Sequence, residues 1–307
     1  MSKPVLLTLH RWITLVFALP LLAIIATGLI LSFEPLVQVS GIGGPAIDSG
    51  RIVELMKRYD PDGKARGFAI NAGAQRMTLQ GADTPAIDLA TGESAAASSR
   101  LPDLFLWARF THERLLGQAW LVTSSTIAMV CLMVLGILMG LPRLRNTLSG
   151  WHKGTAWFAL PLILLCPLTG LCMAFGLTFQ GGAAPAGGGR PLPLPDAVRM
   201  VAASHDLSHV ISIGARGGHM MARIYEGGEL RAYAVTSSGV APLPRNWPRL
   251  IHEGNWSALI ASPLNVVTSI ALLTLLSTGL LIWARRKLRK PRSRPNRQAD
   301  AAVVGAG

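Results

Sequence analysis

The feature that most constrains this chain is a set of four apolar stretches, each long enough to cross a lipid bilayer. A spanning helix needs about 20 mainly apolar residues, and residues 13–33, 119–141, 155–175 and 259–283 meet that length. The chain is 50% hydrophobic and only 15% charged, whereas soluble domains carry about 25% charged residues. We therefore expect an α-helical membrane protein, and we exclude a typical soluble enzyme and a disordered chain.

The basic residues of the chain are concentrated on one predicted side of the membrane. The N-terminus, the loop 142–154 and the tail hold 13 of the 29 Lys and Arg but one of the 16 acidic residues, Asp300. Because such residues mark the cytoplasmic side, we expect both termini in the cytoplasm of a bacterial inner membrane and both long loops in the periplasm. The net charge of +13 is then a topology signal, and no nucleic-acid partner is expected. The predicted divisions are transmembrane helix 1 (1–33), periplasmic module 1 (34–118), helix 2 (119–141), a cytoplasmic loop (142–154), helix 3 (155–175), periplasmic module 2 (176–258), helix 4 (259–283) and a basic cytoplasmic tail (284–307). The first basic residues of the tail, 285–290, are expected to contact anionic membrane lipid.

The sequence contains two copies of one unit. Residues 10–33 and 152–175 both begin with His and a basic residue, contain Phe-Ala-Leu-Pro and Thr-Gly, and end in Phe. A second motif, Arg-x-x-His-Glu, ends at Glu113 and again at Glu253, and the offset is 142 residues for the first motif and 140 for the second. We therefore expect two parallel repeats related by an axis along the membrane normal.

Each long loop has the pattern of a small α+β module. In the first loop a helix is expected at 51–59 and short strands at 69–70, 77–79 and 86–89. In the second loop a helix is expected at 197–203 and strands at 210–213, 222–225 and 231–235, after a Gly/Pro-rich linker at 181–195. The predicted fold is thus four transmembrane helices in two parallel repeats, each repeat with an α+β periplasmic module.

Four of the seven histidines flank the predicted spans, one for each span. The repeat brings equivalent positions together, which predicts the pairs His10/His152 at the cytoplasmic side and His112/His252 at the outer side. Two neutral imidazoles from facing helices hold haem iron with both axial positions filled, an arrangement that favours electron transfer over oxygen chemistry. We therefore predict two b-type haems with bis-His iron ligation. The chain has no Cys-x-x-Cys-His motif for c-type haem.

Further residues are candidates for haem contacts. Gly28 lies 18 residues after His10, so it occupies the same helix face about 27 Å farther along the axis. Gly170 has the same relation to His152, and a small residue at these positions lets an outer haem lie close to the backbone. The candidate partners for haem propionates are Arg11, Lys153, Arg109 and Arg249.

Other patterns in the sequence are less informative. His205 and His209 have the i,i+4 spacing of a shared helix face, but no third metal ligand is evident, and His219 fits a packed turn. The alternative interpretation is that the four histidines at the membrane edges are ordinary interfacial residues that bind no cofactor. No nucleotide-binding fingerprint is present, so electrons would come from another protein, a quinone or a small carrier.

The combined motifs resemble the PepSY-associated transmembrane helix family, and the resemblance covers nearly the whole chain. The matching segments are Leu9-His10-Arg11-Trp12, Thr27-Gly28, Thr111-His112-Glu113-Arg114-Leu115-Leu116-Gly117, Pro142-Arg143, His152 with Thr169-Gly170, His252-Glu253-Gly254, Thr278-Gly279-Leu280-Leu281-Ile282-Trp283 and the Asp88–Glu93 turn, which is similar to the DxxTGE turn of a PepSY module.

The resemblance implies a layout similar to that of inner-membrane siderophore reductases, which carry two haems and pass electrons to ferric siderophores in the periplasm. It implies haem ligation by His10, His152, His112 and His252. The expected function is di-haem electron transfer from an unknown cytoplasmic or quinol donor to a ferric siderophore or other ferric chelate, which makes the chain an oxidoreductase of the ferric-siderophore reductase kind. Two alternatives remain. One is a haem-free PepSY-type sensor or assembly protein with a periplasmic partner, and the other is a quinol-linked cytochrome b that feeds a periplasmic redox enzyme.

Overall fold

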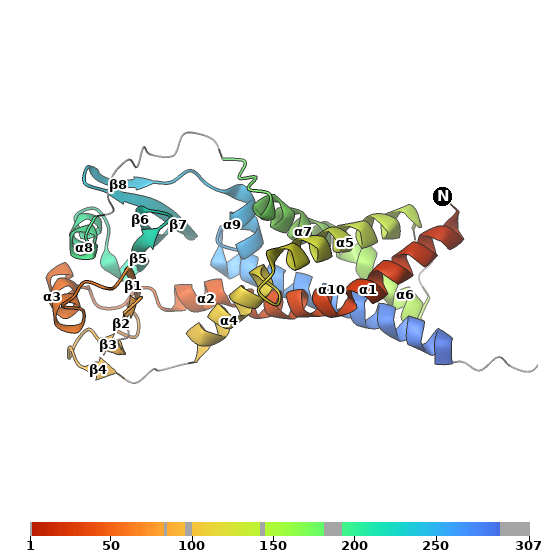
Figure 1. The fold of residues 1–307 in the computed structure, drawn as a ribbon, viewed down its shortest axis with the longest axis horizontal. Helices are drawn as coiled ribbons and strands as arrows, with labels where there is room; N and C mark the ends of the chain where they lie inside the picture. Colours follow the sequence, from red (N-terminus) through yellow and green to blue (C-terminus); the bar gives the residue numbers. More distant parts are fainter. Residues whose placement is uncertain (1, 83–84, 96–99, 142–144, 181–191, 289–307) are drawn as a thin grey trace, which may run out of the picture.

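The computed structural model describes residues 2–82, 85–95, 100–141, 145–180 and 192–288. The molecule is elongated, with a helical bundle at one end and a sheet domain at the other (Figure 1). The N-terminus and the arginines and lysine at the end of the last helix lie at the far end of the bundle, which we call the basic end. The opposite end is the sheet end.

Long apolar helices build the bundle. In the described part of the chain, three helices are long and apolar enough to cross a membrane, or up to four if a bent pair counts as one span. The bent pair is α6 and α7, which meet at 64° just before Pro161, a residue that cannot donate a backbone hydrogen bond. The bundle helices are α1 (Lys3–Leu31), continued by α2 (Glu34–Ser40), α5 (Ala119–Leu138), α6 (Leu148–Phe158), α7 (Leu160–Ala174) and α10 (Ala258–Leu288).

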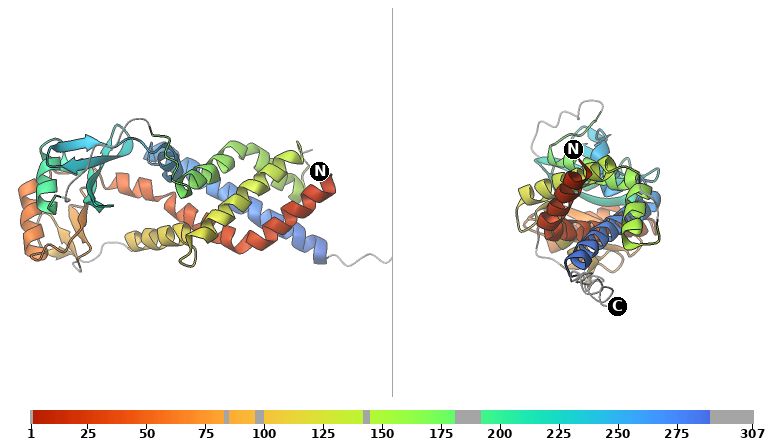
Figure 2. Two further views of the ribbon diagram at one scale, coloured as in Figure 1. Left: turned by 45° about the horizontal axis from the view of Figure 1, so that its top comes forward. Right: turned by 90° about the vertical axis from the view of Figure 1, so that its right-hand side faces the viewer.

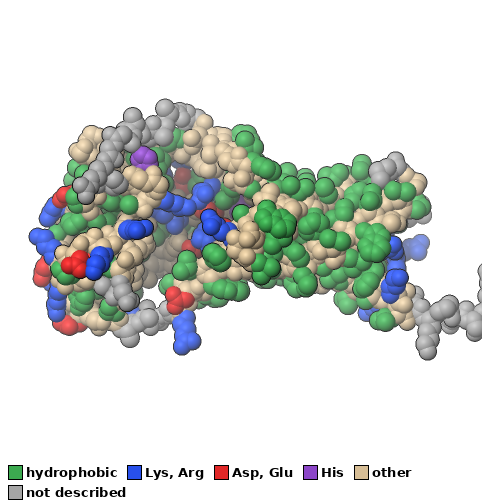
Figure 3. All heavy atoms as spheres, in the orientation of Figure 1, with side chains coloured by type: hydrophobic (Ala, Val, Ile, Leu, Met, Phe, Trp, Pro, Cys, Tyr) green, Lys and Arg blue, Asp and Glu red, His purple; other side chains and the backbone are tan. Residues whose placement is uncertain are grey.

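The outer surface of the bundle is apolar. Phe158, Leu19 and Leu259 are 92%, 79% and 67% exposed, and hydrophobic side chains cover the visible face of the bundle (Figure 3). A soluble monomer rarely exposes an apolar surface of this extent, whereas a lipid bilayer solvates it. The chain is therefore a helical membrane protein with an attached sheet domain.

The strands of both long loops form one sheet. Its order is β4-β3-β2-β1-β5-β6-β7-β8, and the two loops join where β1 pairs antiparallel with β5. A Cβ atom on Gly67 would lie 2.8 Å from the Cα of Gly214, so this seam requires glycine. The strands are β1 (Gly67–Asn71), β2 (Arg76–Gln80), β3 (Ala86–Asp88), β4 (Ser94–Ala95), β5 (Val210–Arg216), β6 (His219–Glu226), β7 (Glu229–Thr236) and β8 (Gly239–Pro242).

Helices α3 (Ser49–Tyr59) and α8 (Leu194–Ala202) pack on one face of this sheet. Their buried residues, among them Ile52 and Val198, form one core with Phe68 and Ile213. The sheet lies between these two helices and the bundle (Figure 2). The helices and strands expected in the two loops are confirmed, but the loops share one sheet instead of forming separate modules, since pairing β1 with β5 covers two strand edges that would otherwise be exposed.

Two short helices connect the sheet domain to the bundle. They are α4 (Leu101–Glu113) and α9 (Trp247–Glu253), and each leads into a bundle helix. They carry His112 and His252 near their C-terminal ends. The sequence pattern did not predict either helix. Residues 181–191 of the expected linker lie outside the described residues.

Candidate functional site

The four histidines at the membrane edges form two close pairs. His10 on α1 and His152 on α6 have ring centroids 6.5 Å apart and ring planes at 89°. His112 on α4 and His252 on α9 have ring centroids 6.0 Å apart and planes at 46°. We call these the basic-end pair and the sheet-end pair. Each pair thus consists of histidines that occupy equivalent positions in the two copies of the sequence unit.

The ring of His112 is held by the backbone and a threonine of α1. Its Nδ1 atom lies 3.0 Å from the carbonyl oxygen of Ile24 and 3.2 Å from the Oγ1 of Thr27. Thr27 donates its own proton to the Ala23 carbonyl at 2.7 Å. Since the hydroxyl has one proton, its oxygen accepts from Nδ1, as does the carbonyl. His112 therefore carries its proton on Nδ1 and has a free lone pair on Nε2.

His252 has the same arrangement against α7. Its Nδ1 lies 3.0 Å from the carbonyl oxygen of Cys166 and 3.2 Å from the Oγ1 of Thr169. Thr169 donates to the Leu165 carbonyl at 2.9 Å. The sheet-end pair is therefore two imidazoles with protonated Nδ1 atoms and free Nε2 lone pairs.

The two members of the basic-end pair differ from each other. The Nδ1 of His152 lies 2.8 Å from the Oγ1 of Thr278, and Thr278 donates to the Thr274 carbonyl at 2.6 Å, which again places the ring proton on Nδ1. The Nδ1 of His10 is buried and has no hydrogen-bond partner among the described residues. Only three of the four rings are therefore fixed by a hydroxyl.

A glycine follows each of these threonines and contacts the same ring. A Cβ atom on Gly28 would lie 3.1 Å from the Cε1 of His112, and one on Gly170 would lie 3.2 Å from the Cε1 of His252. The Cε1 of His152 lies 3.5 Å from the corresponding position on Gly279. The glycines thus let an imidazole ring lie directly against a helix. The sequence predicts a haem contact for Gly28 and Gly170, but it predicts no role for Gly279, although Thr-Gly recurs there.

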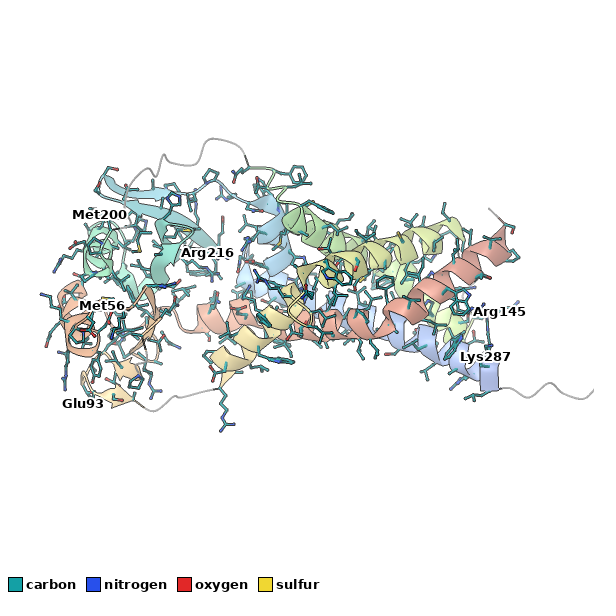
Figure 4. The ribbon with its side chains drawn as sticks, viewed as in Figure 1. Met56, Glu93, Arg145, Met200, Arg216 and Lys287 are labelled. Carbon is teal, nitrogen blue, oxygen red and sulfur yellow. The ribbon has the colours of Figure 1, made fainter. Side chains whose placement is uncertain are left out.

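The basic-end pair borders a cavity of about 1000 Å³ between the bundle helices. Both His10 and His152 line it, with apolar side chains of α5, α7 and α10. Arg145 and Lys287, which also line it, lie together at this end of the bundle (Figure 4). The cations around the cavity are Lys3, Arg11, Arg145, Lys153, Arg286 and Lys287. The cavity thus combines two imidazoles, an apolar wall and a cationic rim, and the rim includes the predicted Arg11 and Lys153.

The arginines near the sheet-end pair face carboxylates. Arg109 contacts Glu34 and lies 3.7 Å from Glu113, and Arg249 lies 3.2 Å from Glu253. In this structure Arg109 and Arg249, predicted as propionate partners, are therefore in ion pairs within the protein.

A charged layer separates the sheet from the sheet-end pair. From β6, the Nη2 of Arg223 donates to the Oε1 of Gln38 on α2 at 3.3 Å. Burial lowers the pKa of Arg223, while the nearby Glu253 and Glu34 carboxylates raise it. Arg216, which also belongs to this group of charges, lies on the side of the sheet that faces the bundle (Figure 4). We call Glu34, Gln38, Arg109, Arg216, Arg223 and Glu253 the charged junction.

The other three histidines lie in the sheet domain, away from both pairs. The ring of His205 lies 4.9 Å from the ring of Tyr233, His209 ends a short 3-10 turn and His219 is exposed at the start of β6. Among the described residues, no group of three or more His, Cys, Asp or Glu side chains is arranged to hold a metal ion.

The geometry of each pair suits a shared metal ion. When two imidazoles bind one metal ion through nitrogen at about 2.0–2.1 Å each, their ring centroids lie about 6 Å apart, and the separations of 6.5 and 6.0 Å are close to that value. Ligation requires a free lone pair on one nitrogen, and a metal-ligating histidine almost always has a hydrogen bond that orients the ring through the other. His112, His252 and His152 have both features.

These features define a class: a helical membrane protein with a histidine pair at each end of its bundle and a sheet domain beside one of them. The sequence model of the family described as the PepSY-associated TM region matches residues 7–286. The chain therefore belongs to this family. A comparison with curated proteins found no match.

Proposed function

We propose that this chain carries electrons across a membrane through two b-type haems, each held by one histidine pair. One observation carries the proposal. The threonine hydroxyls and backbone carbonyls fix the proton of three rings on Nδ1, which leaves Nε2 as a neutral ligand. Any buried imidazole needs a partner for its ring N–H, and a metal-ligating histidine almost always has one. Here a second imidazole also faces each ring, and the centroid separations of 6.5 and 6.0 Å are close to those of two ligands of one metal ion.

The placement of the pairs supports conduction across the whole bilayer. His10 and Gly28, the glycine that contacts His112, are 18 residues apart on α1, which corresponds to about 27 Å. The hydrocarbon core of a bilayer is about 30 Å thick. We propose that the basic end faces the cytoplasm of a bacterial inner membrane and the sheet end faces the periplasm, in line with the excess of Lys and Arg at the basic end.

We also propose that the bundle consists of two parallel repeats. The contacts support this arrangement, because the ring of His112 meets Ile24, Thr27 and Gly28 while the ring of His252 meets the residues 142 positions later. Those later residues are Cys166, Thr169 and Gly170.

The residues of the chain would hold the cofactor and leave the redox chemistry to it. Haem supplies reversible one-electron chemistry at its iron when bound. Each histidine pair would supply two neutral nitrogen ligands to the iron, a ligand set that favours electron transfer. The cationic rim of the basic-end cavity would stabilise carboxylates by charge-assisted hydrogen bonds. The electron donor at this end is a cytoplasmic protein, a small carrier or a quinol.

The acceptor we propose is a ferric siderophore or another ferric chelate in the periplasm. Transfer of one electron converts bound Fe(III) to Fe(II), and oxygen-rich chelators hold the softer Fe(II) less tightly, so that iron is released. The chain belongs to a membrane family, and no nucleotide-binding motif is present in its sequence. Because no nucleotide site is evident in the sequence, the proposed electron path runs from the basic-end pair to the sheet-end pair and from there to the ferric chelate.

The first test is the absorption spectrum of detergent-purified protein, oxidised and dithionite-reduced, with haem quantified as the pyridine haemochrome. We expect a low-spin b-type spectrum and about two haems per chain. Changing either member of one pair to Ala should remove one haem and leave the other. His209→Ala and His219→Ala are matched controls that should keep both. A flat spectrum after expression with ample haem supply would refute the proposal and favour the haem-free sensor.

A second test concerns direction and acceptor. In proteoliposomes with reductant enclosed on the basic-end side, addition of ferric chelates outside should reoxidise the haems. Reduced haems that ferric chelates leave unchanged would refute ferric-chelate reduction. If a quinone-site inhibitor blocked haem reduction by quinol, the donor would be the membrane quinol pool.

A further inference from the structure

Three of the four histidine rings lie against receptors of one design. Each receptor is a turn of a bundle helix that presents a backbone carbonyl, a threonine three residues later and a glycine immediately after the threonine. The threonine hydroxyl in each case donates to the carbonyl four residues before it. The receptors are Ile24/Thr27/Gly28 for His112, Cys166/Thr169/Gly170 for His252 and Leu275/Thr278/Gly279 for His152.

The fourth receptor, on α5, is incomplete. The residues in the same spacing are Leu132, Leu135 and Gly136, and leucine has no hydroxyl where the other receptors have threonine. The Leu132 carbonyl interacts with the ring of His10 as the Leu275 carbonyl does with His152. The Nδ1 of His10 nevertheless forms no hydrogen bond of normal geometry within the described part of the chain, so it lacks the hydroxyl partner of the other three rings. In the described part of the chain, no heavy atom outside the neighbouring backbone lies within 4 Å of the Cβ position of Gly136, so the ring of His10 does not pack against this glycine.

A ligand without this support is held less firmly. The hydrogen bond on the second ring nitrogen fixes the orientation of a metal-ligating imidazole and raises its basicity, and loss of such a partner costs about 10- to 100-fold in metal affinity. Leu132 and Gly136 line the same cavity of about 1000 Å³ as His10.

We infer that His10 is the displaceable ligand of the basic-end site, and that a small neutral ligand from outside the protein can take its place there. The inference rests on the proposed function, because it concerns a haem held by His10 and His152. It makes the two sites chemically unequal. The sheet-end site is closed by two supported histidines, whereas the basic-end site opens on the His10 side.

Carbon monoxide is a suitable probe, because it binds ferrous haem only where an axial position can be vacated. The experiment is an anaerobic carbon monoxide titration of the dithionite-reduced, haem-loaded full chain, followed by absorption difference spectra. We expect carbon monoxide to bind one of the two haems. The variant His112→Ala/His252→Ala, which lacks the sheet-end ligands, should keep this response and so assign it to the basic end.

Leu135→Thr is the decisive variant. A hydroxyl at position 135 would donate to the Cys131 carbonyl, as the other three threonines do, and would accept from the Nδ1 of His10. We expect this variant to bind carbon monoxide about 10- to 100-fold more weakly. Leu135→Val, which is also β-branched but has no hydroxyl, is the matched control and should behave like the wild type.

The outcomes separate this inference from the proposed function. A chain that holds no haem overturns both. A two-haem chain that binds carbon monoxide at neither haem, or at both alike, overturns the inference and leaves the proposed function standing. The same holds if Leu135→Thr and Leu135→Val bind carbon monoxide equally well. A low-temperature EPR spectrum of the ferric protein adds a readout of ligand orientation, since Leu135→Thr should change only the basic-end signal.

Discussion

The Oγ1 of Thr278 lies 2.8 Å from the Nδ1 of His152 and joins α10 to α6 at the basic end of the bundle. Because Thr278 donates its only proton to the Thr274 carbonyl, its oxygen can only accept from the ring. The contact therefore does two things. It ties a short helix to a long one, and it sets which nitrogen of His152 is free.

Removing this hydroxyl should weaken the basic-end site alone. We expect Thr278→Val to lower haem affinity there by about 10- to 100-fold and to leave the sheet-end haem in place, whereas Thr278→Ser should restore the wild-type affinity. The measurement is haem retention during dilution, followed by absorption and EPR. Thr274→Val is the matched control, because its exposed hydroxyl donates only to the Ile270 carbonyl. Equal loss from both sites would contradict the assignment.

The receptor glycines should respond to alanine in a graded order. The added Cβ would lie 3.1 Å from His112 in Gly28→Ala and 3.2 Å from His252 in Gly170→Ala, so each ring must shift. In Gly279→Ala the distance to His152 is 3.5 Å, an ordinary contact. We therefore expect the first two variants to lose the sheet-end haem and the third to keep both haems.

Gly136→Ala completes this series as an internal control. Among the described residues, no heavy atom outside the neighbouring backbone lies within 4 Å of that Cβ position. The substitution should therefore raise the stability of the haem-free chain by about 0.5–1 kcal/mol, because alanine favours the helix interior. Haem content and thermal unfolding of the four variants are the measurements. A loss of the sheet-end haem in Gly136→Ala as large as that in Gly28→Ala would refute the packing argument.

The sequence predicts the membrane spans, the helices α3 and α8, the main strands and the histidine partners because each leaves a local or repeated signal, whereas α4 and α9 leave none. Apolar length marks the spans, and the recurrence of two motifs marks the pairs. The role of Thr27 was not predictable, because its partner His112 is 85 residues away and only the packing of α4 on α1 brings them together. The repeated tetrapeptide Phe-Ala-Leu-Pro gives a second example: the helix continues through Pro20 but breaks before Pro161, so its environment and not its sequence decides the bend.

The joining of the two loops into one sheet was also beyond the sequence pattern. The alternation of apolar and polar residues identifies β1 and β5 as strands, but it does not show that the edge of β1 pairs with the edge of β5. The close approach of Gly67 and Gly214 is a property of the pair, and neither glycine is unusual in its own segment.

Acid should destabilise the sheet domain through two capped turns. The backbone N–H of Thr91 lowers the pKa of Asp88, and the backbone N–H of Ser208 lowers the pKa of Asp206, each from the ordinary value of 3.8. Since the folded pKa values lie below the unfolded ones, the stabilisation is complete above about pH 4 to 5 and is lost as the pH falls through the folded values.

The corresponding measurement is thermal unfolding of the full chain between pH 6 and pH 3. Asp88→Asn and Asp206→Asn should each lower the melting temperature at pH 6 and reduce its dependence on pH. Asp196→Asn is the control, because Asp196 forms only an exposed ion pair with Arg199 on the same helix. A pH dependence that both turn variants leave unchanged would show that other carboxylates control the acid response.

Arg223 should hold the sheet domain to the bundle. It donates from β6 to Gln38 on α2, and its buried guanidinium lies near the Glu34 and Glu253 carboxylates. We expect Arg223→Gln to cost about 2 kcal/mol, the scale of a hydrogen bond to a charged group, and to increase hydrogen exchange in α2 and β6. Arg199→Gln, which removes an exposed ion pair, should cost less than about 1 kcal/mol. The basic-end haem spectrum should not change in either variant, since the charged junction lies at the opposite end of the bundle. If exchange in α2 stayed at the wild-type rate in Arg223→Gln, the sheet and the bundle would be held together by their apolar contacts and the chain connections instead.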